Sequence, residues 1–489
     1  MITKKIYFLV ITSIILLLVY FASRLQNLNA IPVFGDEAIY VRWSQLIKNV
    51  DTLRFVPQSD GKQPLFMWLT AATFKYISNP LTASRTISVI SGSIVLITLY
   101  LTCLIYFNPT TAIISSLLYI TLPFTFFFDR LAVPDTMLSA FGIISLLFSL
   151  LLAKYPRLDL SLLLGFSLGL SWLTKSPAIY FVVLSLATFL VYRQSNYKKI
   201  YFPLISACLG FVIYNILRLG PQFQQIALRN RDYIWSFSEI IKHPLDPLIP
   251  HVKDIFSIYN NYISIPIIIL TLIGTILFFH QCFKNKTVFI IFCWWILPLI
   301  ANAGIAKVFT ARYILFTVPP LIILLSISLS AIFTKFSKLQ ILMFLCLIPN
   351  LLWIYNLSTN PFKLNLSSTE TGYISGWTSG WGIKTAADYL IQRSRVANVI
   401  VGTEGYFGTL PDGLQIYTDR VPQLTIFGVG IDINQIPEKL IDARNHQDEV
   451  YLLFNSSRLK LPPSELQKLT LISAFTKPQN DSLVLYRLN

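Results

Sequence analysis

Two adjacent carboxylates, Asp36 and Glu37, lie in the stretch "IPVFGDEAIYVRWSQ" and are suited to general acid–base chemistry. Pro32 and Gly35 mark a turn before them, and the residues that follow repeat apolar side chains at helical spacing. The pair is therefore predicted at a helix N-terminus, where a carboxylate also satisfies free backbone N–H groups. A helix cap needs only one carboxylate, so both a capping role and a role in chemistry stay open for the pair.

Basic side chains that suit a phosphate group occur in four later segments. Lys62 lies in "DGKQPLFMWL", Lys175 in "GLSWLTKSPAIY", and Arg312 in "ARYILFTVPPL". The segment "FFFDRLAVPDTML" adds Arg130 together with a further carboxylate, Asp135. Each also has a purely structural interpretation: a lysine that extends along apolar surface to water, or a loop ion pair that contributes little to stability.

The elements that must position these residues are apolar enough for a membrane. Of the 489 residues, 54% are hydrophobic and 13% are charged, whereas soluble proteins have about 25% charged residues. The net charge is +16, but many Lys and Arg residues lie in short loops between apolar runs, where they set topology or bind anionic headgroups. This placement argues against nucleic acid as a partner. The five cysteines form no CxxC pair, so no disulfide framework or cysteine metal site is predicted.

A helical span of a bilayer needs about 17–25 apolar residues. Eleven spans are predicted near residues 6–22, 84–106, 110–128, 134–153, 159–174, 177–192, 199–218, 258–280, 287–304, 312–333 and 339–357. The short apolar segment 64–77 is ambiguous. Lys4 and Lys5 place the N-terminus in the cytoplasm. The basic loops later in the chain are also expected in the cytoplasm, and this requires an odd number of spans before residue 130. The segment 64–77 is therefore predicted to lie in the membrane interface, and the candidate residues fall on the outer face.

The composition changes after residue 358, where charge rises and apolar runs shorten. Residues 396–404, 449–457 and 481–489 are predicted as strands, and residues 382–394 and 435–445 as helices. We therefore predict a transmembrane domain at residues 1–360 and a small extracytoplasmic α/β domain at residues 361–489. Trp377 and Trp381 follow the last span, either as an aromatic belt at the interface or as a surface that stacks on a sugar.

Several segments together resemble a known family. These are "GDEAIY", "KQPLF", "SRTISVISG", "DRLAVPD", "GLSWLTKSP" and "ARYILFTVPP", which cover most of residues 30–320. The chain resembles GT-C fold glycosyltransferases of the protein O-mannosyltransferase and lipid A aminoarabinose transferase superfamily, which is glycosyltransferase family 39-like. The expected fold is a polytopic helical membrane protein with a juxtamembrane helix in its first outer loop. One departure is Gln63, which replaces the first proline of the family's Lys/His-Pro-Pro-Leu motif.

The resemblance implies a function and roles for the candidate residues. The chain is expected to move a sugar, with inversion, from a polyprenyl-phosphate-linked donor to an acceptor hydroxyl on a lipid, protein or glycan at the outer face. Asp36 is the implied base, and Glu37 its neighbour that orients it. The implied ligands of the donor phosphate are Lys62, Arg130, Lys175 and Arg312, and those of the acceptor or a metal are Asp135 and His251. No cofactor is assigned, and a divalent metal ion stays open.

Two other classes of membrane protein share parts of this pattern. A transporter or lipid flippase also has many spans and buried charges, but here the charges lie at outer ends of spans and no internal repeat is visible. A polymerase or ligase of lipid-linked glycans shares the spans and outer basic residues but not the early acidic pair. The pattern therefore favours a glycosyltransferase whose partners are a polyprenyl-phosphate donor and membrane lipids.

Overall fold

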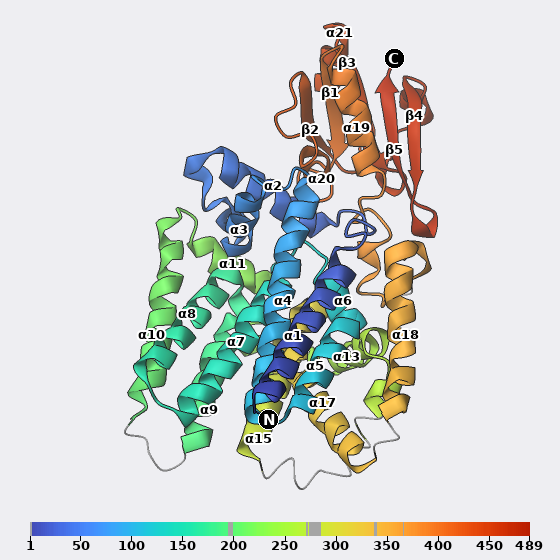
Figure 1. The fold of residues 1–489 in the computed structure, drawn as a ribbon. Helices are drawn as coiled ribbons and strands as arrows, with labels where there is room; N and C mark the ends of the chain where they lie inside the picture. Colours follow the sequence, from blue (N-terminus) through green and yellow to red (C-terminus); the bar gives the residue numbers. More distant parts are fainter. Residues whose placement is uncertain (1, 194–198, 270–271, 273–284, 337–339, 365) are drawn as a thin grey trace. The chain divides into compact units, whose positions relative to one another are not determined.

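The computed structural model describes residues 2–193, 199–269, 272, 285–336, 340–364 and 366–489 (Figure 1). These residues form two compact units. The first comprises Met1–Leu28, Arg54–Phe66 and Arg85–Asn356, and the second comprises Asn29–Leu53, Met67–Ser84 and Leu357–Asn489. The acidic pair therefore packs in one unit with the C-terminal part of the chain, although the sequence analysis assigned it to the domain of residues 1–360.

The first unit is built mainly from apolar helices, which satisfy their own backbone groups where lipid offers no hydrogen bonds. They are α1 (Ile2–Leu25), α4 (Pro80–Tyr106), α5 (Pro109–Thr121), α6 (Pro123–Phe128), α7 (Asp135–Lys154), α8 (Leu158–Thr174), α9 (Ile179–Arg193), α10 (Tyr201–Tyr214), α15 (Lys286–Ile305), α17 (Val318–Lys335) and α18 (Gln340–Thr359). Helix α8 packs between α7 and α10, and α17 packs against α5 and α15 (Figure 1). Gly169 allows the close approach of α8 and α10, because a Cβ there would lie 2.6 Å from the side chain of Ile213.

Most predicted spans are found as apolar helices. Within the described residues, six helices are long and apolar enough to cross a membrane, and four further apolar helices are shorter. Together these helices overlap ten of the eleven predicted spans. The remaining one, 258–280, falls mostly outside the described residues, although α13 (Leu248–Tyr262) covers its start. The length and composition of these helices are those of a multi-span membrane protein.

Two predicted segments show how local sequence divides the membrane part. The predicted span 110–128 is two helices, because α5 ends at Thr121 and α6 begins at Pro123, whose ring removes the N–H donor that a continuous helix needs. The segment 64–77 contains only α3 (Leu65–Thr73), a helix of nine residues. Such a helix rises about 14 Å, so it does not span a bilayer, as the sequence predicts.

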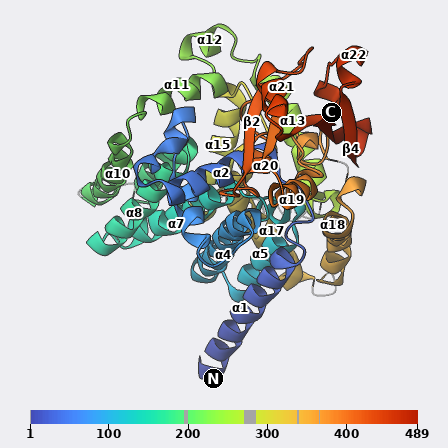
Figure 2. The ribbon, with the colours of Figure 1, turned by 90° about the horizontal axis from the view of Figure 1, so that it is seen from above.

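The spanning helices differ in how much of their surface the protein covers. In the apolar stretch of α1, 17% of the residues are buried. In the apolar stretch of Ala311–Lys335, which includes α17, 83% are buried. Viewed from above, α1 lies at the edge of the first unit (Figure 2). Its exposed Ile, Leu and Val side chains are therefore available to lipid, while α17 belongs to the helical core. Among its described residues, this unit also contains α11 (Gln224–Tyr233), α12 (Phe237–Lys242), α13 and α16 (Ala311–Ile314).

The second unit contains, among its described residues, one five-stranded sheet with the order β2-β1-β3-β5-β4. The strands are β1 (Val399–Glu404), β2 (Leu424–Gly430), β3 (Glu449–Asn455), β4 (Leu469–Thr476) and β5 (Ser482–Leu488). β1 pairs in parallel with β2 and β3, whereas β5 pairs antiparallel with β3 and β4. The helices of this unit are α2 (Gly35–Asn49), α3, α19 (Ile383–Ser394), α20 (Asp412–Gln415), α21 (Glu438–Asn445) and α22 (Pro463–Leu466).

The two longer C-terminal helices cover opposite faces of this sheet. Leu440 of α21 packs in a core with Val450 and Leu452 of β3. On the other face, the ring of Tyr389 in α19 contacts that of Tyr451 in β3, with ring centroids 5.9 Å apart. Because side chains alternate along a strand, β3 is buried on both faces along its whole length. The predicted strands at 396–404, 449–457 and 481–489 and both predicted helices are confirmed, but β2 and β4 were missed.

Candidate active site

The two residues of the acidic pair have different environments. Glu37 is fully buried, and its Oε2 accepts a hydrogen bond of 3.0 Å from the backbone N–H of Phe34, the N-cap residue of α2. This bond is the carboxylate half of a capping box and satisfies a donor at the helix start. Asp36, in the same first turn, is only partly buried. Glu37 therefore fixes the start of α2, and Asp36 is the more exposed of the two carboxylates.

Backbone pairing holds the residues just before Asp36. The N–H of Gly35 donates to the carbonyl of Thr378 at 3.0 Å, and the N–H of Gly380 donates to the carbonyl of Val33 at 2.8 Å. The hydroxyl of Thr409 also donates to the Thr378 carbonyl, at 3.1 Å. A side chain at Gly35 would place a Cβ 2.9 Å from Thr409 Oγ1. The absence of a side chain at this position thus permits the close approach of three chain segments.

The rest of α2 is fixed to the loop that follows α20. Gln45 Nε2 donates to the carbonyl of Ile416 at 2.8 Å. Arg42 forms an ion pair with Asp419 at 2.7 Å, and Asn49 donates to the other oxygen of the same carboxylate at 2.9 Å. These bonds prevent α2 from rotating about its axis or sliding along it. The direction in which Asp36 projects is therefore set by residues of the C-terminal part of the chain.

Asp412, at the start of α20, is a buried carboxyl in the same unit. Its Oδ2 accepts a hydrogen bond of 2.7 Å from the backbone N–H of Gly408. Burial raises the pKa of Asp412 to about 6, although the Gly408 bond and the charge of Arg42 oppose this shift. Desolvation thus dominates over both stabilising contacts of the charged form.

The first unit brings three of the predicted basic residues to one pair of tyrosines. Lys62 Nζ donates to the hydroxyl of Tyr233 at 3.1 Å. The ring of Tyr233 meets that of Tyr313 edge to face, with centroids 6.4 Å apart. Lys175 Nζ lies 4.6 Å from the centroid of the Tyr313 ring, and Arg312 Cζ lies 5.1 Å from it. We call Lys62, Lys175, Arg312, Tyr233 and Tyr313 the basic cluster.

Two carboxylates border the basic cluster. Asp135 Oδ1 lies 2.5 Å from Lys175 Nζ, and Asp60 Oδ2 lies 3.9 Å from Lys62 Nζ. Asp135 is 2% exposed, and its Oδ2 is buried without a hydrogen-bond partner in the described residues. A buried carboxylate oxygen without a donor is destabilising. This oxygen is therefore suited to accept a hydrogen bond from a substrate.

Gln63, which departs from the proline of the family motif, links two parts of the basic cluster. Its Nε2 donates to the hydroxyl of Ser176 at 2.8 Å. Ser176 follows Lys175 in the turn between α8 and α9, as Gln63 follows Lys62. A proline could not make this side-chain bond. Gln63 thus connects the segment that carries Lys62 to the turn that carries Lys175, although the two lie more than a hundred residues apart in the sequence.

The structure places Arg130 at the end of α1. It is fully buried, and its Nη1 donates to the carbonyls of Ser23 and Gln26 at 3.2 and 2.9 Å. Its Nη2 donates to the carbonyl of Asn27 at 2.5 Å. Side chains that bond the last carbonyls of a helix stabilise its C-terminus. These bonds assign Arg130 a structural role that the sequence analysis did not predict.

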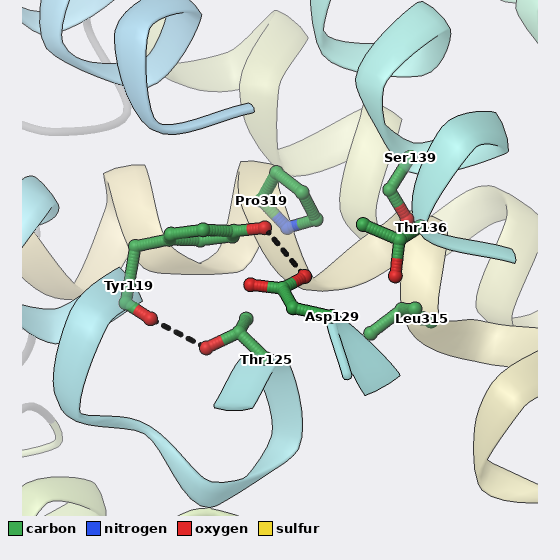
Figure 3. A pocket seen from close by; sticks show the side chains of 7 residues that line it. All are labelled: Tyr119, Thr125, Asp129, Thr136, Ser139, Leu315 and Pro319. Atoms are coloured by element: carbon green, nitrogen blue, oxygen red, sulfur yellow. Dashed lines mark hydrogen bonds between the residues drawn. The ribbon is translucent and has the colours of Figure 1, made fainter. Parts of the chain in front are cut away.

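A small polar pocket lies beside Asp129 in the first unit (Figure 3). Asp129 Oδ1 accepts from the Tyr119 hydroxyl at 3.0 Å, and its Oδ2 pairs with Arg24 at 3.3 Å. The pocket is lined by Tyr119, Thr125, Asp129, Thr136, Ser139, Leu315 and Pro319. It has essentially no room even for a water molecule, so it is not a site for a lipid-linked sugar.

His251 and the two tryptophans are held by structural contacts. Nδ1 of His251 lies 2.9 Å from the carbonyl of Ala303, and its ring stacks on Phe309 with centroids 4.7 Å apart. Within the part of the chain that the structure describes, no group of three or more His, Cys, Asp or Glu side chains could hold a metal. The indole of Trp381 donates to the carbonyl of Ile374 at 2.7 Å.

Trp377 keeps a partly exposed ring. It is 44% exposed, and the guanidinium of Arg458 lies 4.0 Å from the centre of the ring. Arg458 in addition lies 3.6 Å from Glu404. A cation over one face of an indole is a favourable contact, and it occupies the face that a sugar would otherwise stack on. Both interpretations of Trp377, as an interfacial anchor and as a sugar platform, stay predictions.

Sequence reasoning missed Tyr233, Tyr313 and Asp60. Tyr313 directly follows Arg312, and Asp60 lies two residues before Lys62, so a search around each predicted cation would have found both. Tyr233 gives no such signal, because it comes from α11, far along the chain. Its role follows only from the folded arrangement.

Together these features define a class: a multi-span helical membrane protein with an α/β unit, a capped acidic pair and a basic cluster suited to phosphate. The family profile described as dolichyl-phosphate-mannose-protein mannosyltransferase matches residues 61–217 of the chain. A search of curated proteins finds no significant match.

Solved structures share the fold of the whole chain. The crystal structure of ArnT from Cupriavidus metallidurans bound to undecaprenyl phosphate matches with a TM-score of 0.60 and 12% identity, and the match covers 98% of both chains. Its apo structure matches with a TM-score of 0.61 and 12% identity, over 99% of this chain and 98% of that chain. A third match is the archaeal oligosaccharyltransferase AglB from Archaeoglobus fulgidus in complex with an inhibitory peptide and a dolichol-phosphate. Its TM-score is 0.51 and its sequence identity is 11%, and the match covers 92% of this chain and 70% of that chain. The chain therefore has the fold of GT-C glycosyltransferases, and the resemblance predicted from its motifs is confirmed.

Proposed function

We propose that this protein is an inverting glycosyltransferase that moves a sugar from a polyprenyl-phosphate-linked donor to an acceptor hydroxyl at the outer face of the membrane. The observation that carries the proposal is the basic cluster, in which Lys62, Lys175 and Arg312 converge from separate segments on one tyrosine pair. Converging cations with hydroxyl donors suit a phosphate whose negative charge grows during the reaction. The family match and the undecaprenyl phosphate bound to ArnT support this class of donor.

The reaction is a single displacement. The acceptor oxygen attacks the anomeric carbon and forms the new C–O bond. The bond between that carbon and the phosphate oxygen breaks, and its electron pair stays on the polyprenyl phosphate. The proton of the acceptor hydroxyl passes to a carboxylate, for which we propose Asp36. A displacement at one face inverts the anomeric centre, so a β-linked donor would give an α-linked product.

The neighbouring groups have supporting roles in this proposal. Glu37 is buried, and its carboxylate accepts a hydrogen bond from the backbone N–H of the N-cap residue Phe34. In this proposal it sets the position of Asp36 and does not exchange a proton. Lys62 and Arg312 would bind the leaving phosphate as direct cations. Lys175 is paired with Asp135, whose second oxygen would accept a hydrogen bond from the acceptor or the sugar. Arg130 would act indirectly, through the end of α1, and His251 through its packing on Phe309.

Comparison of cells with and without this protein tests the function directly. Mass spectrometry of their glycolipids and glycoproteins should show at least one species that loses a mass equal to one pentose or hexose when the protein is absent. Restoring the wild-type chain should restore that species. Identical glycan profiles in both cells, under conditions where the protein is made and inserted, would contradict a transferase function. Loss of a lipid-linked glycan from one leaflet without any change in glycan composition would instead favour a flippase.

A further inference from the structure

A buried lysine in the second unit has no role in the reaction described above. Lys477 follows β4 and is 2% exposed. Its Nζ donates to the carbonyl of Ser379 at 2.5 Å, to the carbonyl of Gly376 at 3.2 Å and to Asn455 Oδ1 at 2.5 Å. Lysine is almost never fully buried unless its charge is satisfied. The location of this ammonium therefore requires a specific explanation.

The hydrogen bonds of Lys477 match the donors of a charged ammonium. An ammonium has three N–H donors, and the three acceptors are two backbone carbonyls and one amide oxygen. Asn455 is itself fixed, because its backbone N–H and its Nδ2 donate to the two oxygens of Glu404 at 2.7 and 2.6 Å. Burial lowers the pKa of Lys477 to about 8, while Asp481 and Glu404 oppose the shift. The ammonium is thus retained near neutral pH and is anchored to the sheet through Asn455.

The two carbonyls bound by Lys477 belong to the segment that pairs with the residues before Asp36. Ser379 is bridged to Phe34, and its neighbours Thr378 and Gly380 exchange backbone hydrogen bonds with Gly35 and Val33. A continuous series of bonds therefore runs from the sheet, through Lys477 and the segment 376–380, to the start of α2. Asp36 follows Gly35 directly.

We propose that Lys477 is a positioning residue, which fixes the segment 376–380 to the sheet and thereby sets the position of the Asp36 carboxylate. This assigns the C-terminal α/β part a task in catalysis: it holds the base. Only the catalytic consequence of this proposal rests on the proposed function, because the effect of Lys477 on the local structure can be measured without any substrate.

Hydrogen–deuterium exchange of the full-length protein tests the structural half. Lys477→Met keeps the length and apolar stem of the side chain but removes its donors. Exchange at the amides of Gly35 and Gly380 should accelerate about tenfold to a hundredfold, the range expected when charge-assisted hydrogen bonds are lost, while β3 and β5 keep their protection. Lys468→Met is the matched control, because the Lys468 side chain is exposed and pairs with Glu465. Unchanged exchange at Gly35 and Gly380 in a folded Lys477→Met protein would overturn the proposal.

A milder variant covers the case in which Lys477→Met does not fold. Thr409→Val keeps the shape of the side chain and removes one hydrogen bond to the Thr378 carbonyl. Its exchange at Gly35 should rise by about threefold to tenfold, with β3 and β5 unchanged. An unchanged rate at Gly35 would show that the segment 376–380 does not control the start of α2.

Kinetics test the functional half and separate it from the proposed function. In Lys477→Met the kcat of sugar transfer should fall about tenfold to a hundredfold, with the KM for the donor and the binding of undecaprenyl phosphate unchanged. A general loss of fold would change all three. Faster exchange at Gly35 together with wild-type kcat would confirm that Lys477 holds the segment and would instead contradict Asp36 as the base.

Discussion

At the scale of single residues, Asp36 and Glu37 show how two identical charges acquire different roles from their backbone positions. Glu37 accepts from the N-cap N–H and is buried, whereas Asp36 is partly exposed in the same turn. The pair can be recognised in the sequence, because two adjacent carboxylates in an apolar context are unusual. It could not decide which one forms the cap, since that depends on the path of residues 33–35, which a distant segment controls.

The capping role of Glu37 has a measurable consequence. Glu37→Gln keeps an oxygen that can accept from Phe34, so transfer should stay within about threefold of wild type, which is about 0.7 kcal/mol of transition-state stabilisation. Glu37→Ala removes the acceptor and should lower the stability of the protein by about 1 kcal/mol, as other helix caps do. Thermal melting and transfer rates of the two variants test this. A Glu37→Gln protein that melts normally but has lost transfer would show that Glu37 exchanges a proton itself.

The basic cluster predicts an effect on lipid phosphate binding. Lys62→Met removes one charged donor and should weaken the binding of undecaprenyl phosphate about tenfold, or ~1.4 kcal/mol. Lys62→Arg should retain most of the affinity. Lys384→Met is the matched control, because Lys384 is an exposed lysine that pairs with Asp388. Equal affinities of the Lys62→Met and control proteins would remove Lys62 from the phosphate site.

At the scale of elements, sequence patterns succeed where a strand is buried along most of its length and fail where it is half exposed. β1, β3 and β5 were predicted because they form continuous apolar runs at the centre of the sheet. β2 and β4 lie at its two edges and are half exposed, so their apolar signal is weak, and β2 contains two glycines. The basic cluster was found in part, because its cations are rare among apolar spans. Tyr313 could have been found beside Arg312, whereas Tyr233 could not, because it comes from α11 and only packing brings it to Tyr313.

The short helix α20 carries a prediction on pH. The pKa of Asp412 is about 6 in the folded protein, above its value of roughly 4 in an unfolded chain. The folded state therefore binds the proton more tightly, so this group favours folding most below about pH 4 and loses that contribution as the pH rises through 6. Asp412→Asn keeps an acceptor for Gly408 without the charge. At pH 7.5 the variant should melt at a higher temperature than wild type, and its free energy of unfolding should be larger by an amount on the order of 2 kcal/mol. Both differences should shrink at pH 5. A difference that is independent of pH would contradict the role of the Asp412 charge.

At the scale of the whole molecule, the chain divides its tasks between two kinds of structure. The first unit, built of apolar helices, carries the basic cluster, and the second unit, built on a sheet, carries the acidic pair. The positions of ten apolar helices among the described residues and the presence of a sheet domain follow from hydropathy and composition and could be predicted. The assignment of residues 29–53 to the second unit could not, because it depends on side-chain and backbone bonds to residues 378–419.

The orientation in the membrane makes a prediction at this scale. A cysteine at Ser78, which is exposed between α3 and α4, should react with a membrane-impermeant thiol reagent added outside intact cells. Tyr155→Cys, in the exposed turn between α7 and α8, is the control and should react only after the cells are permeabilised. Labelling is compared with that of the unmodified chain, which has its own cysteines. Reaction of the Ser78→Cys protein from the inside alone would reverse the proposed topology.

In the proposed reaction, Asp36 accepts the proton of the acceptor hydroxyl in a sugar transfer from polyprenyl phosphate. The most direct test of this role is the transfer rate of Asp36→Asn, measured in parallel with its melting temperature and its affinity for undecaprenyl phosphate. The rate should fall by about 10²–10⁴-fold, as expected for the loss of a general base, while the other two quantities remain at wild-type values. Transfer at the wild-type rate in a folded Asp36→Asn protein would show that Asp36 is not the base.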